Sequence, residues 1–111
     1  MIKRMLLAIS SVAISTAAIA QDEVKIGMLQ GFTGPTESLV KPMAKGGEMA
    51  IKEVSDSGAF LGGRKVVSVR GDGTRIGAAA ATAAAERLIT SEGVAGINGA
   101  TCSGSTTAVL N

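Results

Sequence analysis

The sequence predicts an α/β protein in which helices flank a parallel sheet, and three observations predict it. Short aliphatic stretches have the composition of strands at residues 24–30, 65–70 and 94–98, and the first has that of a strand buried on both faces. A stretch with helical character follows each of them, at residues 38–57, 78–93 and from 103 onward. Strands separated by helices pair in parallel through right-handed crossovers, which places helices on both faces of the sheet.

The first strand, VKIGMLQ at residues 24–30, ends where two glycines and a proline in residues 31–35 predict a loop. The helix that follows is amphipathic over residues 38–57. Its predicted core-facing positions are spaced by three or four residues, namely Val40, Met43, Gly47, Ile51 and Val54.

Three further residues bear on this first helix. Glu48 and Lys52, on its predicted polar side, have the spacing of an i, i+4 ion pair. Pro42 is tolerated only near the first turn, because a proline deeper in a helix removes a backbone hydrogen bond. Gly58 suits the left-handed C-terminal cap that would end the helix.

The second half of the chain repeats the strand-then-helix order. The three valines of KVVSVR, residues 65–70, suit a strand, and the glycine-rich residues 71–77 form a loop. Alanine, the strongest helix former, occupies seven of the eight positions 78–85, and this helix extends to Gly93. A third strand and the start of a third helix follow.

Sheets of this class usually have about five or more strands, so we expect the N-terminal piece of a longer protein.

Residues 1–20 have the features of a secretory signal peptide. Two cations open the segment, residues 5–19 form an uncharged apolar run, and Ala18 and Ala20 precede a cleavage site. A membrane-spanning helix is the alternative, but the run is shorter than the roughly 20 apolar residues that a bilayer needs. No cysteine near the cleavage site could accept a lipid. We therefore expect a mature protein, residues 21–111, that is released in soluble form into a bacterial periplasm.

Composition excludes several classes of function. Removing residues 1–20 takes away two of the 11 Lys and Arg and none of the nine Asp and Glu, so the mature charge is near zero. A nucleic-acid partner therefore gains no electrostatic support. Histidine is absent, which disfavours a Ser-His-Asp or Cys-His enzyme and a transition-metal site. We expect no enzyme activity, no metal and no cofactor.

A ligand is expected beyond the carboxyl ends of the first and third strands, which flank the switch point of a flavodoxin-like sheet. The two loops at that edge are residues 31–35 and 99–105. The second loop presents hydroxyl groups at a helix start, where unpaired N–H groups favour an anion such as a carboxylate, at Thr101, Ser103, Ser105 and Thr106. The alternative is that Ser103 or Ser105 only caps the helix.

Catalytic motifs at these loops are incomplete. In GATCSGST, residues 99–106, Ser105 stands where a phosphate-binding loop needs lysine, and Ser103 lacks the flanking glycines of a nucleophile elbow. Asp72 is the one carboxylate in a strand-end loop and is interpreted as a solvated or turn-forming aspartate. Cys102 is interpreted as a small apolar residue of the core.

Four segments carry a family resemblance, namely IGMLQGFTGP, GGEMAIKEVSDSGAFLGG, AAERLITSEGVAGINGA and TCSGST. Together they resemble the periplasmic solute-binding proteins of branched-chain amino acid ABC transporters, which are Leu/Ile/Val-binding-protein-like type I periplasmic binding proteins. The resemblance covers residues 24–111. It implies two α/β lobes that close around a branched-chain amino acid or a related small amide or carboxylate and deliver it to a membrane permease. Residues 21–111 would form the N-terminal part of lobe one.

The resemblance also implies roles for individual residues. The serine after the cysteine of the third loop, Ser103 here, binds the ligand carboxylate in the family. Thr101 and Phe32 are expected to line the same cleft, with Ser105 beside them. Leu39 falls where relatives often place an aromatic wall. Arg75 stands where several relatives carry a cysteine that bridges to the position of Cys102, so we expect a free thiol.

Two other functions fit the same fold less directly. A ligand-sensing receptor domain would bind a similar ligand but signal to a partner, and neighbouring permease and ATPase genes would separate it from a transport protein. A flavodoxin-like or Rossmann-type enzyme would need a pyrophosphate-binding motif or a catalytic base, and the sequence has neither.

Overall fold

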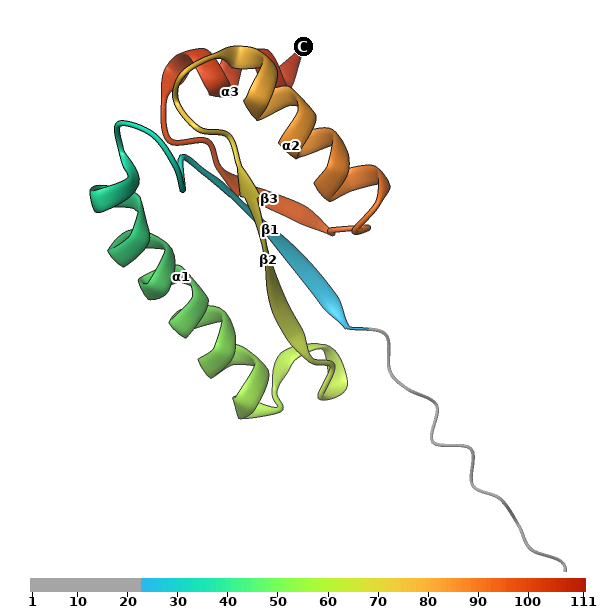
Figure 1. The fold of residues 1–111 in the computed structure, drawn as a ribbon. Helices are drawn as coiled ribbons and strands as arrows, with labels where there is room; N and C mark the ends of the chain where they lie inside the picture. Colours follow the sequence, from blue (N-terminus) through green and yellow to red (C-terminus); the bar gives the residue numbers. More distant parts are fainter. Residues whose placement is uncertain (1–22) are drawn as a thin grey trace, which may run out of the picture.

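The computed structural model describes residues 23–111, and the segment predicted to be a signal peptide lies outside the described residues. Strands and helices alternate along the chain, as predicted (Figure 1), in the order β1 (Val24–Gln30), α1 (Glu37–Ser57), the 3₁₀ turn η1 (Phe60–Gly62), β2 (Val66–Asp72), α2 (Ala78–Thr90), β3 (Gly96–Gly99) and α3 (Ser103–Leu110). No helix among residues 23–111 combines the length and apolar character needed to span a membrane.

The sheet has the order β2-β1-β3, and both pairings are parallel. Leu29 of β1 therefore lies between Gly71 of β2 and Gly99 of β3. The predicted α/β class is confirmed, and so is the adjacency of the first and third strands. Their carboxyl ends meet at one edge, which is where the sequence places the ligand.

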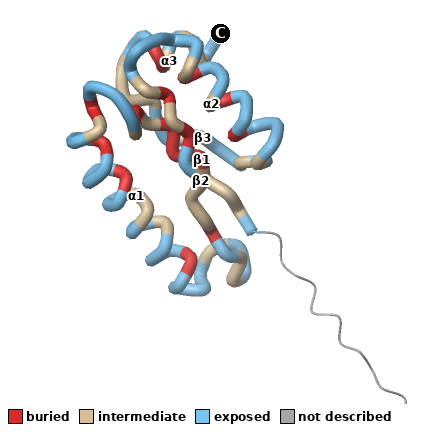
Figure 2. The backbone as a smooth tube through the Cα atoms, in the orientation of Figure 1, coloured by how far each residue is buried: buried red, intermediate tan, exposed pale blue. Residues whose placement is uncertain are grey.

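Helices cover both faces of the sheet (Figure 1). α1 packs against one face, and α2 packs against the other beside α3. The core between α2 and the sheet is built around Leu29, Ala85 and Leu88, and partly buried side chains surround it, including Val69, Ile97 and Val109. The buried positions follow the inward sides of the helices and the middle of the sheet (Figure 2).

Leu88 fits closely because two strands present glycine to it. A Cβ atom added at Gly27 of β1 would lie 3.0 Å from Leu88 Cδ1, and one added at Gly71 of β2 would lie 2.8 Å from it. Real Cβ atoms are essentially never found as close to another atom as the one at Gly71 would be, and the contact at Gly27 would also be unusually tight. The glycines therefore let α2 approach the sheet and bury Leu88 completely.

The buried stripe of α1 differs from the predicted one. Val40 is buried as predicted, but Met43 and Val54 are 61% and 45% exposed, and Ala44 and Ser55 are buried instead. Ser55 can be buried because its hydroxyl accepts a hydrogen bond of 3.0 Å from the backbone N–H of Val66. The prediction assigned the core-facing positions to the larger apolar side chains, whereas two of the residues that are buried, Ala44 and Ser55, are small.

The predicted ion pair between Glu48 and Lys52 is also wrong. Arg70 of β2 donates two hydrogen bonds to Glu48, at 2.5 Å and 2.9 Å, and this interaction lowers the pKa of Glu48. Lys52 pairs instead with Asp56, one turn further along α1. A bidentate pair with arginine has better geometry than an i, i+4 pair, and β2 brings Arg70 within reach.

The ends of α1 are closer to expectation. Gly58 adopts the predicted left-handed conformation, with φ of 68°, and ends the helix. Pro42 lies in the second turn rather than the first, because the helix already begins at Glu37. The missing N–H of Pro42 leaves the Ser38 carbonyl without its usual helical partner.

Candidate functional site

Three loops meet at the carboxyl end of the sheet, and Thr101 joins two of them. Its Oγ1 accepts a hydrogen bond of 2.9 Å from the backbone N–H of Gly31, in the β1–α1 loop. The same hydroxyl donates a hydrogen bond of 2.9 Å to Oε1 of Gln30, the last residue of β1. The two loops predicted to form the site are therefore in direct contact.

Asp72 joins the third loop to the first. It ends β2, and its carboxylate accepts hydrogen bonds from the Thr33 hydroxyl at 2.6 Å, the Thr33 N–H at 3.3 Å and the Thr74 N–H at 2.9 Å. Burial raises the pKa of Asp72, but these bonds and one from the Phe32 N–H outweigh it and hold the pKa below its usual value. The Thr74 bond is the local turn bond that the sequence suggests for Asp72, whereas its bonds to Thr33, 39 residues away, were not predicted.

α3 begins at this edge without a side-chain cap. Its N-cap residue is Cys102, so neither Ser103 nor Ser105 occupies the capping position. Ser103 is the first helical residue and is exposed, while Ser105 is buried. The N–H groups of a first helical turn have no carbonyl partner within the helix, and the helix dipole favours an anion beside them.

Cys102 is not a core residue, contrary to the expectation. It is half-buried, its Sγ lies 3.2 Å from Ser105 Oγ, and it forms no disulfide. Hydrogen bonding to Ser105, aided by the charge of Arg75, lowers the pKa of the Cys102 thiol. The thiol finds polar partners because the chain turns away from the core directly after β3.

A narrow crevice lies where the three loops meet. Its lining comes from the ends of all three strands and includes Gln30, Thr74, Arg75, Thr101, Cys102 and Ser105. Its volume of about 10 Å³ is close to the least that holds a single water molecule. The crevice is therefore a packed joint between loops, too small to hold a ligand larger than water.

The side chains of Phe32 and Leu39 do not line this crevice. Phe32 lines an open groove of about 530 Å³ together with Arg70, Asp72, Arg87 and three alanines of α2. The guanidinium carbon of Arg70 lies 4.9 Å from the centre of the Phe32 ring. Leu39 belongs to α1 and is 66% exposed. Of the five predicted site residues, the structure brings Thr101, Ser103 and Ser105 together at the start of α3.

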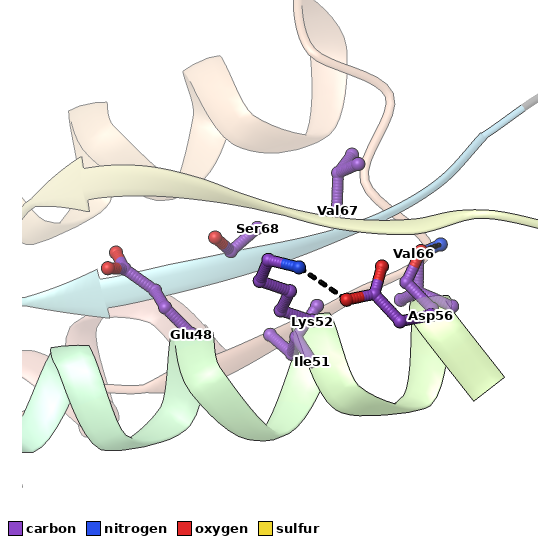
Figure 3. Close-up of a pocket in the computed structure, with 8 residues that line it drawn as sticks. Glu48, Ile51, Lys52, Asp56, Val66, Val67 and Ser68 are labelled. Atoms are coloured by element: carbon purple, nitrogen blue, oxygen red, sulfur yellow. Dashed lines mark hydrogen bonds and ion pairs between the residues drawn. The ribbon is translucent and has the colours of Figure 1, made fainter.

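Another groove, of about 390 Å³, lies along α1 and the outer strand β2 (Figure 3). Its charged side chains are engaged, because Glu48 pairs with Arg70 and Lys52 pairs with Asp56. It also lies beside the sheet rather than at the carboxyl ends of the strands. Within residues 23–111, no group of three or more His, Cys, Asp or Glu is placed to hold a metal ion.

Two residues of the joint were missed by the sequence analysis. Gln30 was assigned only to the first strand, yet its side chain accepts the hydrogen bond from Thr101. Thr33 was assigned only to a loop, yet it carries two of the bonds to Asp72. A polar residue at the carboxyl end of a predicted parallel strand is a usable signal for Gln30, because such ends face the ligand edge.

We expect the contribution of Asp72 to stability to disappear in acid. Its folded pKa lies below the unfolded value of about 3.9, so the stabilisation is complete above that value and is lost as the pH falls through the folded pKa. Asp72→Asn should therefore lower the free energy of unfolding of the full-length protein by roughly 1 kcal/mol at pH 7. Urea unfolding should show a smaller difference from wild type at pH 3.

Glu53→Gln is the matched control for this measurement. Glu53 is exposed, and its carboxylate has no ion pair or hydrogen bond with any residue in 23–111. This variant should match the wild-type protein at both pH values. A stability gap for Asp72→Asn that is as large at pH 3 as at pH 7 would show that the carboxylate charge is not what stabilises the loops.

The chain matches a known protein family and several known proteins. The family described as periplasmic binding protein matches residues 23–111. Leu/Ile/Val-binding protein homolog 7 of Brucella abortus (strain 2308) is 40% identical over 100 residues, which cover 89% of this chain and 24% of that protein. The same homolog in Brucella suis biovar 1 gives the same values. The chain thus spans about a quarter of the length of the curated relatives it matches.

A solved structure has the same fold. It is the branched-chain amino acid transporter substrate binding protein LivJ from Streptococcus pneumoniae, in complex with isoleucine. The match has a TM-score of 0.71 at 25% identity and covers 80% of this chain and 25% of that one. These likenesses agree with the order of strands and helices described above.

Proposed function

The chain belongs to the periplasmic binding protein family, and from this premise we propose that it is the solute-binding component of an ABC transporter. Its ligand is a branched-chain amino acid or a related small amide or carboxylate, which it delivers to a membrane permease. Family and structural neighbour are solute-binding proteins rather than enzymes. The Leu/Ile/Val-binding homologs and the isoleucine complex of the neighbour support this choice of ligand.

One observation carries the proposal, namely the exposed Ser103 at the uncapped start of α3. Its hydroxyl can donate to a carboxylate, and the first-turn N–H groups can bind the same anion. Ser105, two residues later, is buried, and its Oγ lies 3.2 Å from Cys102 Sγ. Phe32 and the exposed Leu39 are the side chains that we assign to the apolar part of the ligand.

The cellular location follows the same reasoning. The family implies a place outside the cytoplasm. We assign the protein to the periplasm, reached through a signal peptide at residues 1–20, so that the mature chain begins at Gln21. N-terminal sequencing of the exported protein tests this assignment.

Ser103→Ala should weaken isoleucine binding by about 10-fold to 100-fold. A hydrogen bond to a charged group contributes about 1.5–3 kcal/mol, and each 1.4 kcal/mol changes the affinity about tenfold. Calorimetry on the full-length protein with isoleucine measures this change. Ser103 is exposed, so the free energy of unfolding should stay close to that of wild type.

Thr107→Val is the matched control, because it removes a hydroxyl one turn further along α3. Among residues 23–111, the Thr107 hydroxyl has one hydrogen bond, to the Ser103 carbonyl of the same helix. Its affinity for isoleucine should remain within about twofold of wild type. An unchanged affinity in Ser103→Ala would mean that the carboxylate binds elsewhere.

A further inference from the structure

The turn that follows β1, residues 31–33, is held from two sides by side chains of the neighbouring strand ends. On the β3 side, the Gly31 N–H donates to the Thr101 hydroxyl at 2.9 Å. On the β2 side, the Thr33 N–H and hydroxyl donate to Asp72. The turn belongs to no helix or strand, so these bonds replace the regular backbone pairing that it lacks.

The chemistry of Thr101 argues against direct contact between its hydroxyl and a ligand carboxylate. A threonine hydroxyl has one hydrogen to donate, and Thr101 donates it to Gln30 Oε1. A carboxylate is an acceptor and needs a donor. As long as Thr101 holds Gln30 and Gly31, it has no hydrogen left for the ligand.

The turn is also closely packed at its start. A Cβ atom at Gly31 would lie 2.7 Å from Thr36 Oγ1 and 3.0 Å from the Thr74 carbonyl oxygen. Directly before the turn, the Gln30 carbonyl accepts a hydrogen bond of 2.8 Å from the N–H of Gly73 in the β2–α2 loop. The turn is therefore fixed against both the β2–α2 loop and the β3–α3 loop, and these three segments form one joined rim.

We propose that Thr101 and Asp72 are positioning residues, which fix the turn at residues 31–33 against the start of α3 before the ligand arrives. This inference rests on the proposed function, because the rim borders the proposed amino acid site. A turn that is already ordered loses less conformational entropy on binding, and so increases affinity without touching the ligand. If either anchor is removed, the turn must become ordered when the ligand binds, and this loss of conformational entropy lowers the affinity.

The test compares Thr101→Val with Thr101→Ser in the full-length protein. Valine keeps the shape of threonine but neither donates nor accepts, whereas serine keeps the hydroxyl. Two quantities are measured at a temperature where all variants are folded. They are isoleucine affinity by calorimetry, and hydrogen exchange of the peptide that covers residues 29–36 in the ligand-free protein.

We expect Thr101→Val to bind isoleucine about tenfold more weakly and to exchange the amides of the turn about tenfold faster, because turn and ligand are coupled. Thr101→Ser should restore both quantities to within about twofold of wild type. Asp72→Ala, which removes the anchor on the β2 side of the turn, should likewise weaken isoleucine binding and speed the exchange of the turn amides. Thr90→Val is the control and should change neither quantity, because in the described part of the chain the Thr90 hydroxyl bonds only to the Glu86 carbonyl within α2.

Three results would overturn the inference, and a fourth would overturn only the proposed function. Weaker binding in Thr101→Val with unchanged exchange would show that Thr101 contacts the ligand directly. Faster exchange with unchanged affinity would show that the anchors serve the fold alone. If wild-type protein binds no leucine, isoleucine or valine, the proposed function fails, and exchange alone then decides. Unchanged exchange in both variants would overturn the positioning role, and faster exchange would support it.

Discussion

Gly99→Ala should destabilise the protein by at least about 4 kcal/mol, which is a large part of the roughly 5–15 kcal/mol that holds a typical domain folded. An added Cβ would lie 1.9 Å from the Leu29 carbonyl oxygen and 2.8 Å from its carbonyl carbon. Both atoms belong to the backbone of the central strand, so they cannot turn aside as a flexible side chain could. Gly99 also has φ of 138°, which side chains rarely allow.

Gly96→Ala in the same strand is the matched control. Among residues 23–111, a Cβ atom there meets no atom within 4 Å beyond its chain neighbours, and Gly96 does not have a positive φ. Urea unfolding followed by far-ultraviolet circular dichroism should place this variant within about 1 kcal/mol of wild type. If Gly99→Ala matched the Gly96→Ala variant, the end of β3 would have to lie further from β1 than the structure places it.

Leu88→Ala should lower the free energy of unfolding by about 3–5 kcal/mol, the second-largest loss that we expect. Leu88 is fully buried and belongs to the core cluster with Leu29 and Ala85. The glycines that face it, Gly27 and Gly71, have no side chains that could move into the vacated space. The cavity would therefore collapse poorly, which puts the expected cost in the upper part of the range for leucine.

Ile89→Ala provides the comparison for Leu88→Ala. Ile89 is the next residue of α2 but is 57% exposed, so its removal leaves no cavity. Its truncation should cost less than about 1 kcal/mol in the same urea experiment. Equal losses in the two variants would mean that α2 is rotated about its axis relative to the structure.

The order of elements could be predicted from the sequence because it depends on local patterns. Aliphatic runs marked the strands, the alanine-rich stretch marked α2, and Gly58 marked the end of α1. The buried stripe of α1 could not be predicted as well. Burial of Ser55 depends on the Val66 N–H, which belongs to a strand 11 residues away in the chain.

The same limit applies to the candidate site. The edge of the sheet and the start of α3 follow from general rules for parallel sheets, and the structure places Thr101, Ser103 and Ser105 there. The partners of Thr101 do not follow from such rules, because they lie 70 and 71 residues away from it in the sequence. The stacking of Phe32 with Arg70 likewise depends on how β2 sits beside β1.

The outer side of β2 has a consequence for the behaviour of the protein in concentrated solution. The Ser55 hydroxyl occupies the Val66 N–H, and Arg87 donates a hydrogen bond of 2.6 Å to the Arg70 carbonyl oxygen. An extended segment of another molecule that paired with the outer side of β2 would have to displace the side chains of Ser55 and Arg87. Such blocking of backbone groups is one way in which proteins prevent uncontrolled strand-to-strand aggregation.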